Sequence, residues 1–334
     1  MARPARWVAV TATEDFPVAM APVRRVLKGV APVRIVSLPF RPLSDVEEER
    51  FAGEFRGAHG ILLRPGYVTA TLLDQLPDLH VVAVHGVGVD QVDVEACSAR
   101  SVLVTNAPGA NADAVAEFTI GLMLSLARRI PESAGRVRDE QVWGAARHTG
   151  GELKGKTLGL IGLGQIGVRV GRIAQAFGMK VCAHDPALSK AEIRDCDARP
   201  MTFEALLRAS DYVSLHAPFT PETHHLIGLW AIAKMKKGAF LVNAARGPLV
   251  DEKALARALA AGRLGGAALD VLEGEPPDPA SPIFDAPNII LTPHMAGSTN
   301  ECLDTIARTA AADIARVLDR KRAKFPVNRP VKRR

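Results

Sequence analysis

The stretch KTLGLIGLGQIG at residues 156–167 joins six residues of strand-like, mostly apolar sequence to three glycines in the spacing GxGxxG. The first six residues predict a buried strand, and residues 168–177 continue as a predicted helix. In such a unit Gly162 allows the tight turn, Gly164 lets a pyrophosphate approach the helix N-terminus, and Gly167 permits close packing of helix on strand. The glycine spacing alone is a weak signal, but in this context it predicts a dinucleotide-binding unit.

A predicted strand at 180–184 ends one residue before Asp185, which lies eighteen residues past Gly167. An acid at this position is placed to hydrogen-bond the ribose diol of an adenosine. Its charge would repel a 2′-phosphate, so we expect NAD as the cofactor and not NADP. The alternatives are a solvated loop acid at Asp185 and an ordinary strand–helix turn at the glycines.

Short β-branched runs alternate with helical stretches along most of the chain, the pattern of parallel sheets with crossover helices. We expect the class α/β, with two Rossmann-like doubly wound parallel-sheet domains, the outer one discontinuous and flavodoxin-like. The second series of predicted strands has six members, as in a dinucleotide-binding sheet. The predicted strands lie at 7–11, 33–38, 60–63, 80–84 and 102–105, and then at 156–161, 180–184, 212–215, 240–243, 267–271 and 289–291.

Two predicted helices lie outside this alternation. Apolar residues at helical spacing predict a helix over 111–129, which Pro131 closes, and another over 298–318. Since no strand follows the last helix, this helix must pack on a sheet formed by earlier strands. Packing on the sheet of the first series is the simplest arrangement. We therefore expect an outer domain of residues 1–105 plus 297–334 and an inserted NAD-binding Rossmann domain of residues 106–296.

The chain has 42 Lys and Arg against 36 Asp and Glu in 334 residues, a net charge of +6, and a pI near 9.3. Residues 320–334 contain eight bases and no acid, so the preceding residues carry 34 bases against 36 acids, a net of −2. We expect 320–334 to be a solvated tail. Because the body is near neutral and Phe325 is the one aromatic residue in the tail, nucleic acid is not the expected partner.

Composition and length favour a soluble protein of about two domains. The longest strongly apolar helical stretch, 119–127, is far shorter than the ~20 residues that span a bilayer. Residues 1–10 lack a following apolar segment like that of a signal peptide. We expect a cytoplasmic protein with no membrane partner and no metal, because the four cysteines have no CxxC spacing; they are Cys97, Cys182, Cys196 and Cys302.

Polar residues follow three predicted strands of the second series, at the edge where doubly wound sheets bind ligands. Arg246 follows the strand at 240–243, Glu275 the one at 267–271, and His294 the one at 289–291. Reducing a 2-oxo acid needs a cation for the carboxylate and carbonyl, which Arg supplies as a two-pronged donor. It also needs a proton donor, which His supplies when a carboxylate sets its tautomer and raises its pKa. A salt-bridged Arg246, a capping Glu275 and a core His294 are the alternatives.

Longer segments surround these residues: GLGQIG at 162–167, NAARGPLVD at 243–251, ALDV at 268–271 with Glu275-Pro276, and TPHMAGST at 292–299. Together with GVGVD at 86–90 and the stretch 106–117, they resemble the signature segments of the NAD-dependent D-isomer specific 2-hydroxyacid dehydrogenases. The resemblance covers nearly the whole chain. It implies an outer substrate-binding domain and closure of the two domains over the substrate.

The resemblance also implies residue roles. Arg246 would hold the substrate carboxylate and carbonyl, and Glu275 and His294 would form the proton-transfer pair. Asp270 would contact the nicotinamide carboxamide, and the backbone of Val87 and Gly88 the substrate carboxylate. The predicted cofactor-binding residues are Gly162, Gly164, Gln165, Ile166, Gly167, Asp185, His216, Ala217, Pro218, Ala244, Asp270 and Gly297, and the predicted substrate-binding residues are Arg64, Val87, Gly88, Arg246 and His294.

Other histidines allow plainer interpretations. His216 resembles a family position near the cofactor, with a structural role as the open alternative. His224 and His225 are expected on a surface turn, and His85 could face the cleft. The segment 106–150 resembles the dimer-forming segment of the family, so a homodimer is expected.

The residues around Arg64 bear on which 2-hydroxy acid is the substrate. Arg64 resembles an arginine that phosphoglycerate members use near the substrate phosphate, but Pro65-Gly66-Tyr67 replaces the small polar residues expected after it. Val84 stands where some of those enzymes carry another Arg, and a chain ending at residue 334 has no room for their C-terminal regulatory domain. We expect hydroxypyruvate or glyoxylate, with D-3-phosphoglycerate as the alternative. An alternative of another class is a NAD-sensing, co-repressor-like binding protein.

Overall fold

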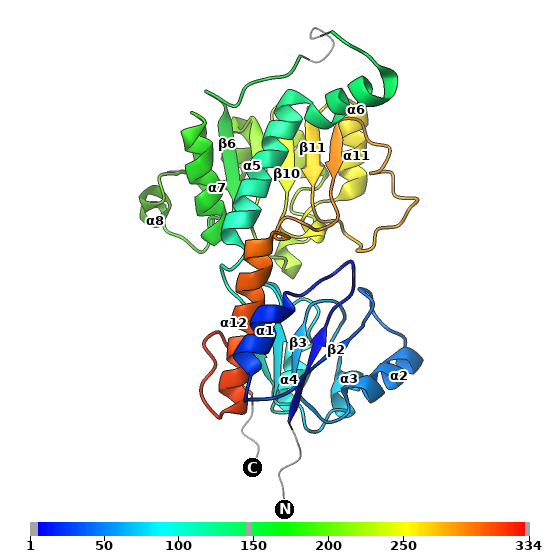
Figure 1. The fold of residues 1–334 in the computed structure, drawn as a ribbon. Helices are drawn as coiled ribbons and strands as arrows, with labels where there is room; N and C mark the ends of the chain where they lie inside the picture. Colours follow the sequence, from blue (N-terminus) through cyan, green and yellow to red (C-terminus); the bar gives the residue numbers. More distant parts are fainter. Residues whose placement is uncertain (1–5, 145–148, 331–334) are drawn as a thin grey trace, which may run out of the picture. The chain divides into compact units, whose positions relative to one another are not determined.

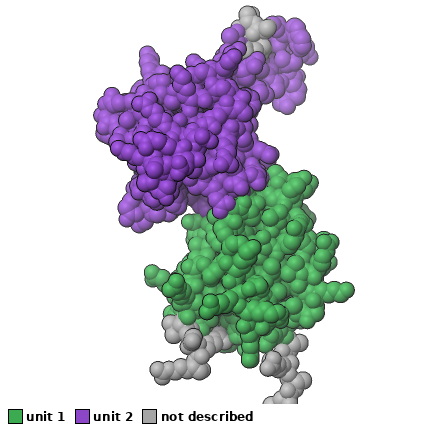
Figure 2. All heavy atoms as spheres, turned by 90° about the vertical axis from the view of Figure 1, so that its left-hand side faces the viewer, with its two compact units in different colours: residues 1–111, 298–334 green, residues 112–297 purple. Residues whose placement is uncertain are grey.

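The computed structural model describes residues 6–144 and 149–330, and it divides the chain into two compact units. Unit 1 comprises Met1–Asn111 and Ser298–Arg334, and unit 2 comprises Ala112–Gly297. Figure 2 colours the two units separately. The chain thus leaves unit 1, builds unit 2 and returns, so unit 1 is discontinuous.

Unit 1 contains a five-stranded parallel sheet in the order β2-β1-β3-β4-β5, the flavodoxin-like order. All five strands lie within a few residues of their predicted positions. They are β1 (Trp7–Thr11), β2 (Val33–Val36), β3 (Ala58–Leu63), β4 (Val81–Val84) and β5 (Leu103–Thr105).

Helices cover both faces of this sheet (Figure 1). Val8 and Val10 of β1 pack on the face covered by α1 and α12, whereas Trp7 and Ala9 pack with the helices of the other face. Successive strand residues point to opposite faces, so a sheet covered on both sides needs continuous apolar strands. The covering helices are α1 (Met20–Leu27) and α12 (Asn300–Leu318) on one face, and α2 (Asp45–Phe55), α3 (Ala70–Asp74) and α4 (Val94–Ala99) on the other.

Unit 2 contains a seven-stranded parallel sheet in the order β12-β11-β10-β9-β6-β7-β8. The direction of winding reverses between β6 and β9, which makes this a Rossmann order with one added strand. The six predicted strands are present, and β8 is an additional strand of two residues. The strands are β6 (Thr157–Ile161), β7 (Lys180–His184), β8 (Arg199–Pro200), β9 (Tyr212–Leu215), β10 (Phe240–Asn243), β11 (Gly266–Leu269) and β12 (Ile289–Leu291).

Two layers of helices cover the sheet of unit 2 (Figure 1). One layer holds α5 (Ala112–Arg128), α7 (Gln165–Ala176) and α8 (Lys190–Asp195). The other holds α9 (Phe203–Ala209), α10 (Leu229–Lys234) and α11 (Glu252–Ala260). No helix within the described ranges is both long and apolar enough to cross a membrane.

The chain after α5 differs from the prediction. Arg129 adopts a left-handed φ of 53°, and a further helix, α6 (Ile130–Glu140), begins at once with Pro131 in its first turn. Proline is tolerated there because the first amides of a helix have no intrahelical acceptor. Pro131 therefore helps to start a second helix, where the sequence was interpreted as closing the first.

The prediction of a solvated tail after residue 319 is wrong for residues 324–328. The buried carboxylate of Asp313 accepts hydrogen bonds from the amides of Lys324 and Phe325 at 2.6 and 2.9 Å. The side chain of Asn328 accepts from the amide of Val104 at 2.8 Å and donates to a neighbouring carbonyl. The basic segment is thus docked along β5 by polar groups, and residues 331–334 lie outside the described part.

Candidate active site

The glycine turn follows β6, where two of its glycines exclude a side chain. Gly162 has a φ of +90°, and a Cβ there would lie 2.7 Å from backbone atoms of His216 and Ala217. A Cβ on Gly167 would lie 2.4 Å from the carbonyl oxygen of Gly162. The absence of side chains at both positions lets α7 begin directly against the turn.

Gly164 lies at the open side of the same turn. It is the N-cap of α7, no described side chain caps this helix end, and nothing lies within 4 Å of a Cβ built on Gly164. The first amides of a helix, here from Gln165 and Ile166 onward, have no intrahelical acceptor, and the helix dipole adds positive character. The geometry therefore fits the pyrophosphate of a dinucleotide.

Asp185 follows β7 and lies beside this turn. Its Oδ2 accepts the amide of Leu163 at 2.8 Å, and its Oδ1 accepts the amide of Ala187 at 2.9 Å. A carboxylate offers about four acceptor positions, so about two remain for the hydroxyls of a ribose. The residue present, its charge and its place beside the glycines all fit the adenosine half of NAD.

His216 follows β9 and packs behind the glycine turn. Its Nε2 lies 2.9 Å from the hydroxyl of Ser214, and its Nδ1 has no partner among the described residues. Burial lowers the pKa of His216 to about 4, so the ring is neutral at physiological pH. Ala217 and Pro218 continue from His216 toward the surface.

The carboxyl ends of β10, β11 and β12 carry the three predicted catalytic residues. Glu275 Oε2 lies 2.7 Å from Nδ1 of His294, and the two side chains are 24% and 45% exposed. A second bond, from the amide of Leu272 at 3.3 Å, orients Glu275 Oε1. With Nδ1 held by the carboxylate, Nε2 is the ring nitrogen left for proton exchange with a substrate.

Asp270 organises the turn on which His294 lies. Its buried carboxylate accepts hydrogen bonds from the hydroxyl of Thr292 at 2.7 Å and from the amides of Met295 and Ala296 at 2.9 and 2.8 Å. Burial raises the pKa of Asp270, while these hydrogen bonds oppose the shift. His294 itself has a left-handed φ of 52° and donates its amide to the carbonyl of Asp270.

The sequence interpretation missed this positioning role, because it assigned Asp270 to the cofactor alone. The three hydrogen bonds use three of about four acceptor positions, so about one remains for a carboxamide. An acid within the otherwise apolar run ALDV was the one signal in the sequence that such a role existed. Gly297 comes directly after the turn that Asp270 holds, and it is the last residue of unit 2.

Arg246 is positioned by a buried asparagine at the end of β10. The side chain of Asn243 accepts the amide of Ala245 at 3.0 Å and donates to the carbonyl of Arg246 at 2.8 Å. Arg246 also donates through Nη1 to the carbonyl of Ala245 at 2.6 Å. Ala244 and Arg246 are half-buried in this segment.

The next residue, Gly247, brings the Arg246 segment against the loop that carries Glu275. A Cβ on Gly247 would lie 1.8 Å from the carbonyl oxygen of Leu272, so only glycine fits. The segments that follow β10 and β11 are therefore in contact, because these two strands are parallel neighbours and end at the same edge of the sheet.

The remaining predicted residues belong to unit 1. Arg64 follows β3 and lies with Nη1 3.1 Å from Nδ1 of His85, which follows β4. Burial, and then the charge of Arg64, lowers the pKa of His85 to about 3, so this imidazole is neutral and can accept from the guanidinium. Arg64 Nε and His85 Nε2 are buried and have no hydrogen-bond partner among the described residues.

The turn of Val87 and Gly88 also follows β4. The side chain of Asn106 donates to the carbonyl of Val87 at 2.6 Å, and the amide of Ala107 donates to the carbonyl of Gly86 at 2.8 Å. These bonds hold the turn beside the end of β5. The sequence interpretation did not foresee the Arg64–His85 pair, because the two residues are 21 positions apart.

Comparison with known proteins places the chain among dehydrogenases. The family model described as "D-isomer specific 2-hydroxyacid dehydrogenase, NAD binding domain" matches residues 120–296. The D-3-phosphoglycerate dehydrogenase of Methanocaldococcus jannaschii is 41% identical over 85% of this chain and 54% of its own length. The glyoxylate reductase of Thermofilum pendens is 40% identical over 79% of either chain.

Solved structures agree in fold. The TT0316 protein from Thermus thermophilus is 36% identical, covers 97% of this chain and 100% of its own, and superposes with a TM-score of 0.86. The present chain spans about half the length of the phosphoglycerate dehydrogenase named above. The glycine turn, the strand-end residues and these similarities together show that the chain belongs to the D-isomer specific 2-hydroxyacid dehydrogenase family and contains its NAD-binding domain.

Proposed function

We propose that the chain is an NAD(H)-dependent D-2-hydroxyacid dehydrogenase that reduces a small 2-oxo acid, hydroxypyruvate or glyoxylate, and catalyses the reverse oxidation. The 2.7 Å pair of Glu275 and His294 carries this proposal. Bound NADH supplies the hydride in this chemistry. Glu275 holds Nδ1 of the imidazole, and the Nε2 proton of His294 passes to the substrate oxygen as it becomes an alkoxide.

The other residues bind and orient. We assign the substrate carboxylate and carbonyl to Arg246, whose guanidinium offers a bidentate donor pair. We assign the backbone amides of Val87 and Gly88, in unit 1, to substrate binding. In this assignment unit 1 is the substrate-binding domain, and unit 2 holds NAD between the glycine turn and Asp185.

The proposal is tested by NADH consumption with hydroxypyruvate, glyoxylate and 3-phosphohydroxypyruvate, together with the reverse oxidation of D-3-phosphoglycerate. We expect turnover of hydroxypyruvate or glyoxylate, with NADH preferred to NADPH. Absence of turnover with every acid, together with salt-sensitive DNA binding, would favour the NAD-sensing binding protein instead.

Arg64 supports D-3-phosphoglycerate as the second candidate substrate. Its half-buried guanidinium is hydrogen-bonded to the neutral ring of His85, so that pair neutralises none of its charge. A cation in this position favours an anionic group on the substrate. Against a phosphate, Val84 at the end of β4 is buried in the apolar core and supplies no charge.

The variant Arg64→Gln separates the two substrates. If the phosphate binds here, the substitution lowers kcat/KM for D-3-phosphoglycerate far more than for D-glycerate, the product of hydroxypyruvate reduction. Equal losses for the two acids would remove Arg64 from phosphate recognition.

We propose further that the chain forms a homodimer through residues 106–150. Within the described part of this segment, large apolar side chains are exposed: Ile130 is 50% exposed, Val137 39% and Trp143 88%. Exposed apolar groups of this size are typical of surfaces that a partner covers. A molar mass of one chain, measured by light scattering at micromolar concentration, would contradict the dimer.

A further inference from the structure

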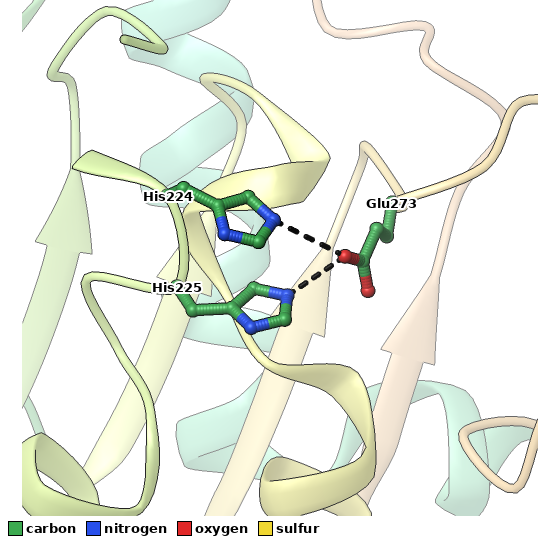
Figure 3. Close-up of side chains that lie close together, drawn as sticks. All are labelled: His224, His225 and Glu273. Carbon is green, nitrogen blue, oxygen red and sulfur yellow. Dashed lines mark hydrogen bonds and ion pairs between the residues drawn. The ribbon is translucent and has the colours of Figure 1, made fainter. Parts of the chain in front are cut away.

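A cluster of two histidines and one glutamate lies apart from the proposed catalytic pair. His224 and His225 follow the short helical turn Pro221–Thr223, and Glu273 lies in the loop after β11. Figure 3 shows both rings directed toward the carboxylate. Nε2 of His224 lies 3.6 Å from Glu273 Oε1 and Nε2 of His225 lies 2.7 Å from it, and one ligand atom from each residue falls within 4.8 Å of the others.

The backbone at His225 explains how neighbouring side chains meet on one side. Adjacent residues of an extended chain point in opposite directions. His225 has a left-handed φ of 51°, and the two rings stack with centroids 4.0 Å apart at 19°. The amide of His225 donates to the carbonyl of Pro248 at 2.8 Å, which holds the turn in place.

The charge around the cluster favours a cation. The amide of Glu273 donates to Oε1 of the buried Glu252 at 2.6 Å, so two carboxylates lie close to the two imidazoles. A positive ion at Glu273 would be attracted by both carboxylates.

We propose that His224, His225 and Glu273 bind a Zn²⁺ ion through both Nε2 atoms and one carboxylate oxygen, with water completing the coordination. Bonds from zinc to imidazole nitrogen and carboxylate oxygen are about 2.0–2.2 Å, so donors to one ion lie up to about 4.4 Å apart. The contacts of 3.6 and 2.7 Å fall within that limit.

The side chains can make the remaining adjustment because all three are substantially exposed, at 48%, 34% and 41%. The 2.7 Å contact is that of a hydrogen bond, so the ion replaces the shared proton, which is released to solvent. Two imidazoles with one carboxylate suit zinc, whereas Mg²⁺ and Ca²⁺ prefer oxygen ligands alone.

The bound ion would join two segments near the proposed active site. Glu273 stands two residues before Glu275 in the same loop, and the neighbouring Leu272 donates its amide to Glu275. On the other side, His225 is bonded to Pro248, two residues after Arg246. Zinc would therefore act on this loop as a clamp, without touching the proton-transfer pair.

Calorimetric titration of the full chain with ZnCl₂, after removal of metal with EDTA, tests the site without reference to activity. We expect one Zn²⁺ per chain. His224→Ala, which leaves the turn at His225 in place, and Glu273→Gln should each weaken binding at least about tenfold, since even loss of a residue that supports a ligand costs about 10–100-fold. The matched control His184→Ala removes an imidazole of unit 2 that is bonded to Met201 and lies outside the cluster, and should leave binding unchanged.

Circular dichroism of each variant shows that it has folded. Three results would overturn the proposal: no stoichiometric binding by the wild-type chain, binding that is unchanged in both His224→Ala and Glu273→Gln, or binding that His294→Ala abolishes while both of those variants retain it. The last result would place the ion at the Glu275–His294 pair.

Discussion

Replacing Asp270 with Asn tests whether its carboxylate positions the His294 turn. Oδ1 accepts both the hydroxyl of Thr292 and the amide of Met295, and Oδ2 accepts the amide of Ala296. An asparagine can keep its oxygen on the first pair, but its NH₂ then faces the amide of Ala296, and two donors meet in a buried site.

The expected loss follows from these contacts. One charge-assisted bond disappears and one buried amide is left unpaired, at a cost of about 1–3 kcal/mol, and the other two bonds weaken because the acceptor is no longer charged. Asparagine is uncharged, so the substitution also removes the cost of burying a carboxylate, the same cost that raises the pKa of Asp270, and this gain offsets part of the loss. We expect a net destabilisation of about 2–3 kcal/mol, or about 4–12 °C in Tm for a unit of this size.

Activity should fall as well, because displacement of His294 by about 1 Å can reduce turnover about 10²-fold. Thermal unfolding and kcat of Asp270→Asn are compared with those of Thr292→Val, which removes a single donor and should cost about 1.5 kcal/mol. The positioning role is refuted if Asp270→Asn keeps wild-type Tm and kcat and only weakens NADH binding. The carboxylate would then serve the cofactor and not the turn.

Four further predictions concern single residues. His294→Ala should leave NADH binding intact, as measured by fluorescence titration, and lower kcat at least ~10²-fold; near-normal turnover would exclude it as the general acid. Asp185→Ala should erode the preference for NADH over NADPH in kcat/KM, and an unchanged ratio would mean that Asp185 does not face the ribose. Because the pKa of His85 is lowered in the folded chain, the histidine of the unfolded chain is protonated first as the pH falls. The contribution of His85 to the free energy of unfolding is therefore retained above about pH 6.5, and about 2 kcal/mol is lost at about pH 5. Urea unfolding should show a flatter dependence of stability on pH for His85→Gln. Asn328→Ala should destabilise the chain by about 1–3 kcal/mol because the amide of Val104 loses its acceptor, and an unchanged Tm would mean that the docked segment adds no stability.

Local patterns predicted most of the elements, because apolar periodicity and glycine spacing act over a few neighbouring residues. The strand β8 was missed because its two residues, Arg199 and Pro200, are too few to show a period. The helix starting at Pro131 was missed because a proline after a helix was interpreted as its end, although the same residue is favoured in a first turn. The docking of the C-terminal segment on β5 was missed because Val104, whose amide donates to Asn328, is more than 200 positions away.

By itself, the sequence determined the class of fold, the glycine turn and the position of Arg246, Glu275 and His294 after three strands of one sheet. It could do so because parallel strands end at a common edge, so polar residues that follow neighbouring strands are brought together whatever the detailed packing. Only the tertiary structure decided which side chains touch. The bonds of Asp270 to the His294 turn, the Arg64–His85 pair and the cluster of His224, His225 and Glu273 depend on separations of about 3 Å, the range of a hydrogen bond. Those separations are set by sheet register and loop conformation, which no periodicity in the chain encodes.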